Sequence, residues 1–487
     1  MNTMGPGPLP TSTTGTTSNY GSITDWTGAD DPDNPRNFPR RIRIYSTVAV
    51  TVLAFVTAFA ASIYSPGIEL VSAEFSVSHS VAVLPLSLYN LGLAAGPMLG
   101  SPLSETYGRK IVLVVTTPGF MVFTLGSALA GDIVSLCVCR FFAGVCAAPA
   151  VGNASASICD YTAGEKRAVA MAIYYSVPTF GASLGPLVGG FAVQARGWRW
   201  TQWIVLICAG ACYIPILFTR ETYKKTILQR RAKKAGLTSP TISQKPWPQQ
   251  IRYFATTLLL RPVHMLFTEP IVGLVCLYNG FIFGVLYTFI IALPWVYSTT
   301  YAFGPTATNL SYLGLILGTI LVPIPLILTD HHIYQPRLRA FASRSPPGAQ
   351  YPPEHRLHAA LPASLLLPAS LFAFAWTARP QIHWLCPIAF QTLTMLANLM
   401  VYAPANLYMI DSYGPLYGAS AAGAAMLARY AFSAAFPLFA LQLYEALGVG
   451  WATSVLGFCA VGLAPVPWLF FRFGEGVRGR SRYETSL

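Results

Sequence analysis

Long stretches of this chain contain no charged residue, and the longest of them covers residues 270–329. Because a bilayer core offers no water to polar groups, a run of about 20 apolar residues is the pattern of a membrane-spanning helix. Only 10% of the residues are charged, against about 25% in a soluble domain, and 54% are hydrophobic. The sequence therefore predicts an all-α integral membrane protein.

Twelve apolar runs have the length of a membrane span, because the turn sequence at 303–305 divides the longest stretch into two. They cover residues 44–65, 80–100, 111–130, 133–157, 168–193, 200–219, 271–297, 307–329, 358–377, 383–409, 417–441 and 450–471. The predicted organisation is two six-helix halves (44–219 and 271–471) with a disordered N-terminus (1–43), a basic linker (220–270) and a tail (472–487) outside the bilayer. Residues 341–353 are also predicted to be disordered.

The net charge of +13 is distributed in a way that indicates topology rather than nucleic-acid binding. Arg140 and Arg429 lie within runs, and Arg196, Arg199 and Arg379 fall in odd-numbered connections. Almost all other basic residues belong to the termini and the even-numbered connections, so both termini are predicted to be cytoplasmic. The basic segment 220–234 fits either an amphipathic helix on the inner membrane surface or a solvated linker.

A glycine-rich segment within the fifth run, GASLGPLVGG at 181–190, is the most informative short motif. On a helix, Gly181, Gly185 and Gly189 share one face, so a neighbouring helix can pack backbone against backbone. Pro186 removes a backbone donor and favours a bend. We expect these residues and Gly190 to form a close-packed seam that moves during function; a static packing seam is the alternative.

The connection between the second and third runs, SPLSETYGRK at 101–110, contains one acid, one turn glycine and two bases. A carboxylate in such a loop can hold a helix end or an arginine and release it when the helices move. We therefore expect a gating role for Glu105, Gly108, Arg109 and Lys110. Taken alone, the loop also fits a simple charged turn.

Together these segments resemble the major facilitator superfamily, and specifically its twelve-span fungal drug:proton antiporters. The 101–110 loop is similar to that family's signature loop, RFFAG at 140–144 to its span-four arginine motif, and 181–190 to its span-five antiporter motif. The segment 31–38 resembles the family's element before the first span, with Phe38 where Trp is usual. Five further segments resemble other characteristic segments of the family: 62–67, 198–200, 221–223, 353–357 and 411–414. Ser101 and Glu105 replace the commoner Gly and Asp. The resemblance implies two six-helix halves that export a compound by alternating access.

Two arginines, Arg140 in the fourth run and Arg429 in the eleventh, lie in otherwise uncharged segments. A charge inside the membrane is costly, so such a residue is expected to face a cavity and to have a partner. We expect the pair to hold an anionic substrate or to influence a proton site. Capping of backbone carbonyl groups and snorkelling to the membrane surface are the alternatives.

Acidic residues are absent from the middle of the first run, where a proton carrier would be convenient. Glu69 and Asp160, near the ends of runs, are therefore the candidates for proton coupling. Asn398 and Tyr174 are further candidates for substrate contact or proton coupling, because intramembrane polar groups need partners and aromatic rings stack on planar ligands. A substrate that carries its own proton would need no acid in the protein.

The leading hypothesis is a monomeric, multi-pass plasma-membrane transporter that exports a small organic compound (a secondary metabolite, toxin or drug) from a fungal cell by proton antiport. Residence in the vacuolar membrane is the second choice of location. An exporter of a small organic acid held by Arg140 and Arg429 is the alternative function, and a transporter-like nutrient receptor is a more distant one. The sequence contains no phosphate-binding loop, catalytic triad or metal-ligand spacing, so no enzyme activity, cofactor or metal is expected.

Overall fold

The computed structural model describes residues 25–28, 30–162, 165–235, 260–344, 346 and 351–483, and every regular element within these ranges is helical. Inside the ranges, a few side chains are not described: those of 97–99, 101, 102, 105, 165–168, 415 and 416. The predicted disorder of residues 1–24 and 347–350, and the linker residues 236–259, lie outside the described part of the chain.

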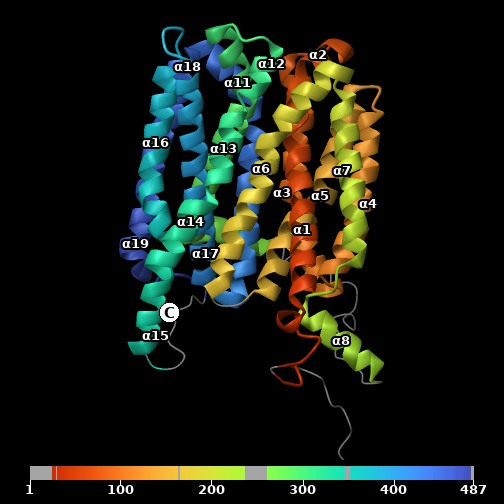
Figure 1. The fold of residues 1–487 in the computed structure, drawn as a ribbon, viewed down its shortest axis with the longest axis vertical. Coiled ribbons are helices and arrows are strands. Elements are labelled where there is room, and N and C mark those ends of the chain that lie inside the picture. The colour runs from red at the N-terminus through yellow and green to blue at the C-terminus, as the bar shows by residue number, and fades with distance from the viewer. Residues whose placement is uncertain are drawn as a thin grey trace, which may run out of the picture.

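A first group of helices occupies one side of the molecule (Figure 1). It consists of α1 (Arg40–Ser62), α2 (Ile68–Phe75), α3 (His79–Tyr107), α4 (Arg109–Ala128), α5 (Ile133–Tyr161), α6 (Glu165–Arg196) and α7 (Arg199–Phe218), with short 3₁₀ turns at Pro35–Asn37 and Ser65–Gly67. The long helices pack on one another, α3 and α4 on α5, and α1 on α5, α6 and α7. The linker helix α8 (Lys224–Lys234) follows at the lower end of the view.

The second group begins with α10 (Arg261–Thr268) and forms the other side of the molecule (Figure 1). It continues with α11 (Pro270–Tyr301), α12 (Pro305–Leu310), α13 (Leu313–Leu321), α14 (Pro323–Thr329), a π-helical turn (Asp330–Tyr334), α15 (Gln335–Arg344), a 3₁₀ helix (Pro353–Ala359), α16 (Ala360–Thr377), α17 (Leu385–Ala435), α18 (Pro437–Leu463) and α19 (Pro465–Arg478). Proline opens five of these α-helices and the 3₁₀ helix at Pro353, where its missing N–H would have had no intrahelical partner.

Ten helical segments among the described residues are long and apolar enough to cross a bilayer. Each contains most of one of the twelve predicted spans. The other two predicted spans, 80–100 and 417–441, coincide with α3 and with the part of α17 after Gly414. Positive φ angles at Gly414 (58°) and Gly448 (71°) interrupt the helical geometry there, and they separate the last three predicted spans. The predicted all-helical membrane fold is confirmed.

The two groups meet along two seams, in which α3 packs on α17 and α6 packs on α12, α13 and α14. One direct contact is the pair of hydroxyl groups of Ser183 on α6 and Thr319 on α13, whose oxygens are 3.4 Å apart. The helices α6 and α17 also contact each other, so a site between the groups can take side chains from both.

The glycine face of α6 packs against α1, within the first group. A Cβ atom at Gly181 would lie 2.6 Å from the carbonyl oxygen of Phe55, and one at Gly189 would lie 2.2 Å from that of Ile63. At Gly185 it would meet the Ser62 hydroxyl at 2.1 Å and the Ile63 nitrogen at 2.8 Å. The predicted backbone-to-backbone packing is present. Gly190 faces Asn309 of the second group instead.

Candidate functional site

A small cavity lies where the two groups face each other, and we call it the central pocket. It has a volume of about 30 Å³. Its lining includes Tyr174, Tyr175 and Thr179 on α6, Phe283 and Tyr287 on α11, and Tyr402, Arg429 and Tyr430 on α17. The lining is thus largely aromatic and contains one cationic side chain, which is the composition of a site for an amphipathic ligand.

Arg429 is buried in this pocket among aromatic rings. Its guanidinium carbon lies 4.3 Å from the ring centroid of Tyr430 and 4.8 Å from that of Phe283, and its Nη1 donates a hydrogen bond to the phenolic oxygen of Tyr402. Cation–π contacts offset part of the cost of removing a guanidinium from water. The ion pairs of the described residues all lie elsewhere, and Arg429 Nε donates to no described acceptor. Among the described residues, no carboxylate balances the positive charge of the pocket, and Arg429 Nε has no acceptor.

The size of the central pocket has a mechanical consequence. A cavity of about 30 Å³ holds one or two water molecules, whereas pockets for small organic ligands occupy about 300 Å³ or more. A bound compound of that size requires the lining helices to move apart. Because the lining comes from both groups, such a movement changes the contact between α6 and α17.

Arg140 is placed differently from Arg429. It is fully buried on α5 inside the first group, where both Nη atoms donate to the carbonyl oxygen of Ala60 at 3.0 Å. Its guanidinium also lies over the rings of Tyr89 (4.5 Å) and Tyr64 (5.4 Å). This is the carbonyl-capping arrangement that the sequence left open as an alternative, and Arg140 does not line the central pocket.

The remaining candidates for substrate or proton contact are scattered. Tyr174 lines the central pocket, and its hydroxyl donates to the carbonyl oxygen of Val151 at 2.5 Å. Asn398 is buried one turn of α17 before Tyr402, but it does not line the pocket. Glu69 is exposed at the start of α2, so the structure does not place it with the other candidates.

Asp160 belongs to a polar network at the end of the bundle that carries α8, which we call the linker-helix end. Its Oδ2 lies 3.7 Å from Arg109 Nε and accepts a 3.0 Å hydrogen bond from the Thr222 hydroxyl. Arg109 Nη1 donates to the Ser104 hydroxyl at 2.7 Å, and its guanidinium lies 4.9 Å from the Tyr223 ring centroid. The network joins α3, α4 and α5 to the segment before α8.

A second carboxylate completes this network. Glu221 is buried and accepts hydrogen bonds from the backbone nitrogens of Arg109 (2.8 Å) and Lys110 (3.2 Å), the first two residues of α4. It thereby satisfies N–H groups that lack intrahelical partners and places negative charge at the positive helix end. Gly108 precedes them with φ of 103°, and a Cβ atom there would lie 2.3 Å from Glu221 Oε2. Glycine is therefore required both by the backbone angle and by the space.

Among the described side chains, Glu221 is a carboxylate that holds the start of α4. The side chain of Glu105 lies outside the described part of the structure, so its predicted gating role stays a prediction. Lys110 takes part in the network through its backbone nitrogen. The segment 221–223 resembles the family in sequence. The contact of Glu221 with Arg109 and Lys110 did not follow from the sequence, because more than 100 residues separate the two segments.

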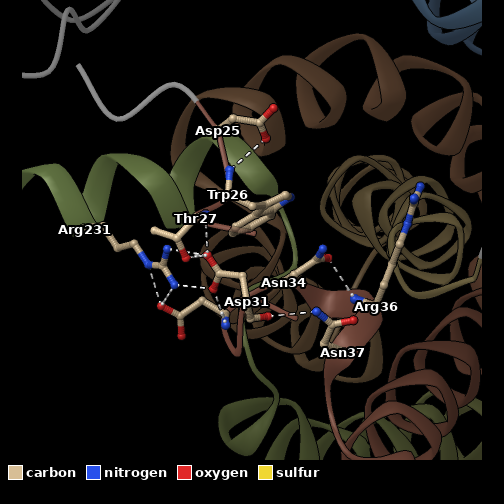
Figure 2. Close-up of polar contacts among 9 residues, drawn as sticks. Asp25, Trp26, Thr27, Asp31, Asn34, Arg36, Asn37 and Arg231 are labelled. Atoms are coloured by element: carbon tan, nitrogen blue, oxygen red, sulfur yellow. Dashed lines mark hydrogen bonds and ion pairs between the residues drawn. The ribbon is translucent and has the colours of Figure 1, made fainter. Parts of the chain in front are cut away.

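The described residues of the segment 25–38, which the sequence places in a disordered leader, instead contact Arg231 of α8 (Figure 2). Phe38 contacts α5 through Tyr161. Arg231 of α8 pairs with Asp31 through two hydrogen bonds of 2.7 and 2.5 Å and donates to Asp33 at 2.7 Å. The Asp31 side chain is completely buried, and Phe38 packs on the ring of Tyr161. We call this contact between 25–38 and α8 the N-terminal clasp. The clasp explains why these residues are ordered and not disordered as predicted, because Asp31 and Asp33 pair with Arg231.

The clasp also changes the interpretation of α8. The segment is helical, which fits the amphipathic-helix alternative, but its face toward Asp25–Phe38 is occupied by the chain's own acids. Lys224 pairs with Asp25 at 2.7 Å, and its Nζ lies 5.7 Å from the Trp26 ring centroid. The position of α8 is therefore set by the N-terminal segment as well as by Glu221 and Thr222.

Comparison with known proteins agrees with this architecture. The model of the Major Facilitator Superfamily matches residues 50–437. The chain is 33% identical over 472 residues to the efflux pump radE of Floropilus chiversii, covering 96% of this chain and 86% of that protein. It is 32% identical over 481 residues to polyamine transporter 4 of Saccharomyces cerevisiae, covering 94% and 73%.

The fold of this chain is also similar to that of a solved structure. The proton:xylose symporter XylE of E. coli superposes with a TM-score of 0.62 at 15% sequence identity, covering 89% of this chain and 97% of that one. This similarity concerns the arrangement of the helices alone. The match over residues 50–437 and the relatives above 30% identity establish that the chain belongs to the major facilitator superfamily and is a membrane transporter, not an enzyme.

Proposed function

We propose that this protein exports a small organic compound from a fungal cell by alternating access around the central pocket. The observation that carries the proposal is the placement of Arg429 and its aromatic neighbours between the two helix groups. A site built from both groups binds a ligand differently in each arrangement of the groups, which is the physical requirement for coupling binding to movement. The name of the relative radE, an efflux pump, supports the outward direction.

The networks around the pocket support the movement. The Glu221–Arg109–Asp160 cluster holds the linker-helix end of the first group through charge-assisted bonds that can break and re-form. The glycine face of α6 brings this pocket-lining helix directly onto α1, so both helices move as one unit. We therefore assign gating roles to Gly108, Arg109, Lys110 and Glu105, and a coupling role to the seam at 181–190.

Export of an organic acid is the second candidate, and a specific observation favours it. Arg429 forms no ion pair with any described Asp or Glu, and its free Nε lies among the pocket residues. A carboxylate, phenolate or enolate of the substrate would supply the missing negative charge and an acceptor. The capped position of Arg140 leaves Arg429 as the anion-binding group in this proposal.

Proton antiport in the plasma membrane is the driving mechanism that we propose for the exporter. The described lining of the central pocket contains no carboxylate, so a proton would act elsewhere. Asp160, which is linked to Arg109 and Thr222 at the linker-helix end, is the group that could sense it. An acidic substrate could instead bring its own proton, which would make the pH gradient act through the substrate.

The test combines a genetic and a biochemical measurement. An untargeted comparison of metabolites in the medium of strains with and without the gene identifies the compound, which should accumulate inside cells that lack the protein. Inside-out vesicles should then take up that compound in response to an imposed pH gradient. Unchanged metabolite distribution together with uptake that ignores the gradient would exclude active export. Export of a polyamine, the class of compound that the name of polyamine transporter 4 contains, would exclude only the organic-acid candidate.

A further inference from the structure

A second cavity adjoins the central pocket and shares part of its wall. It has a volume of about 160 Å³ and is formed by α5, α6 and α17. Tyr175, Tyr402 and Met426 line both cavities. These three side chains are therefore the partition between the two spaces.

The second cavity lies on the linker-helix side of the central pocket. Its lining includes Cys159, the neighbour of Asp160, and Ile410, the neighbour of Asp411. Along α17, Ile410 is eight residues beyond Tyr402, a rise of about 12 Å. A compound that enters from the linker-helix end would thus reach this cavity first and the central pocket second.

The partition is built mainly from two tyrosines, one from each helix group. The rings of Tyr175 on α6 and Tyr402 on α17 meet edge to face, with centroids 5.3 Å apart and an interplanar angle of 78°. Phe283 on α11 also packs edge to face on Tyr402, with ring centroids 5.1 Å apart. Because α6 and α17 belong to different groups, separating the groups opens the contact between the two tyrosines.

Tyr402 has a second role, because its hydroxyl accepts the hydrogen bond of Arg429. The Arg429 guanidinium is the group in the central pocket that can bind an anion. An anion that binds the Nη1 and Nη2 edge of the guanidinium competes with the Tyr402 oxygen for Nη1 and weakens the bond that fixes the Tyr402 side chain. An anion held by the free Nε alone leaves that bond in place. Binding of a ligand at the Nη1 edge and closure of the partition therefore oppose each other.

We propose that Tyr175 and Tyr402 form a gate between the two cavities, and that the Arg429–Tyr402 hydrogen bond keeps this gate closed until an anion occupies the central pocket. The inference rests on the proposed function and deepens it, because it assigns both the substrate charge and the inner gate to named residues. An uncharged compound of the same shape does not break the hydrogen bond between Arg429 and Tyr402, so the gate opens less often in its presence.

The gate can be measured without any transport assay. Thr179 lines the central pocket but not the second cavity, whereas the native Cys159 lines the second cavity. A Thr179→Cys variant in oriented vesicles is treated from the linker-helix side with a membrane-impermeant thiol reagent, and labelling at both positions is followed by mass spectrometry. We expect Tyr402→Phe to raise the labelling rate at position 179 about tenfold, because a hydrogen bond to a charged group contributes roughly one to two powers of ten. Labelling of Cys159 should stay the same.

Three further variants make the result specific. Arg429→Gln should accelerate labelling as much as Tyr402→Phe, and the double variant should add nothing, because both remove one bond. Tyr312→Phe is the matched control, since its buried hydroxyl donates to Ile290 outside the pocket, and it should label like the parent. An unchanged rate in Tyr402→Phe, or additive effects in the double variant, would overturn the gate.

Binding of benzoate tests the competition for Arg429. Tyr402→Phe should bind benzoate several-fold more tightly than the parent, because the guanidinium no longer has to leave the tyrosine, while binding of uncharged benzamide should not change. Equal benzoate affinity in both proteins would overturn the anion dependence. Absence of metabolite export in cells would reject the proposed function, but it would not alter the labelling result, so the two failures are distinguishable.

Discussion

Arg429 donates a hydrogen bond to the hydroxyl of Tyr402, a residue 27 positions earlier on the other side of Gly414. The bond links the cationic centre of the pocket to one of the two rings that separate it from the neighbouring cavity. No sequence periodicity connects these positions, because the contact depends on how the two parts of α17 pack.

Replacement of Arg429 by Gln should reduce export of an anionic substrate about ten- to a hundredfold, the value of one lost charge-assisted hydrogen bond. Export of a neutral compound should not fall. Initial rates of efflux for a radiolabelled aromatic acid and an uncharged analogue check this difference. The exposed Arg379, changed to Gln in parallel, is the matched control and should leave both rates unchanged. Equal loss for both compounds in Arg429→Gln would contradict the anion-binding role.

Substitution of Glu221 by Gln should slow the transport cycle several-fold with little change in KM. The amide loses the negative charge at the start of α4 while remaining nearly isosteric, so the effect is electrostatic. Arg109→Ala and Glu105→Ala should likewise impair turnover more than binding. The measurement is kcat and KM of counterflow in proteoliposomes, with exposed Glu475→Gln as the control. Normal turnover in all three variants would argue against a gate at this end.

A methyl group added at Gly185 should destabilise the protein by about 1–3 kcal/mol, the usual cost of overpacking. Its Cβ would lie 2.1 Å from the Ser62 hydroxyl and 2.8 Å from the Ile63 nitrogen, and the backbone of α1 cannot move aside cheaply. The control is Gly152→Ala on α5, where a Cβ meets nothing within 4 Å. Thermal unfolding in detergent should separate the two variants. Gly185→Leu should also abolish transport, and wild-type transport in that variant would mean that the seam does not matter.

The N-terminal clasp should resist mild acid. Its hydrogen bonds from Arg231 hold the pKa of Asp31 far below the usual value near 4. A depressed pKa gives a contribution that is complete above the unfolded-state pKa and is lost as the pH falls through the folded-state pKa. The protection factors for hydrogen exchange at residues 25–28 and 30–38, which remove the intrinsic pH dependence of the exchange rate, should therefore stay constant from pH 8 to about pH 5.

Asp31→Asn should expose the clasp segment at every pH, because it leaves Arg231 with a weaker partner. Asp25→Asn is the control, since its pair with Lys224 is largely exposed and contributes little. A charge exchange, Asp31→Arg with Arg231→Asp, should restore part of the protection. Rapid exchange at residues 25–38 in the unmodified protein would contradict the clasp.

Much of the fold could be predicted from local pattern. Apolar runs are long because each helix must satisfy its backbone groups alone within the bilayer, so the span positions follow from one-dimensional hydropathy. The spacing of Gly181, Gly185 and Gly189 likewise predicted a close contact, because a helix places every fourth residue on one face. The identity of the partner, α1, did not follow from that spacing.

The site was predicted only in part. Arg429 and Tyr174 were named from the sequence and line the central pocket, but Arg140 showed the same signal, a charge in an apolar run, and caps Ala60 instead. Hydropathy cannot separate these cases, because both arginines interrupt an apolar run in the same way. Glu221 and the order at Asp25–Phe38 were missed, since each depends on a partner more than 100 residues away.

By itself the sequence determined that the chain is a helical membrane protein, where its spans lie and which family it resembles, because these depend on local composition and short motifs. The tertiary structure decided which buried charge faces a cavity, which carboxylate holds the start of α4, and that Tyr402 belongs to both the pocket and its partition. Those facts arise from helices that meet across the bundle, and the energy of a buried charge is set by the groups that surround it in space.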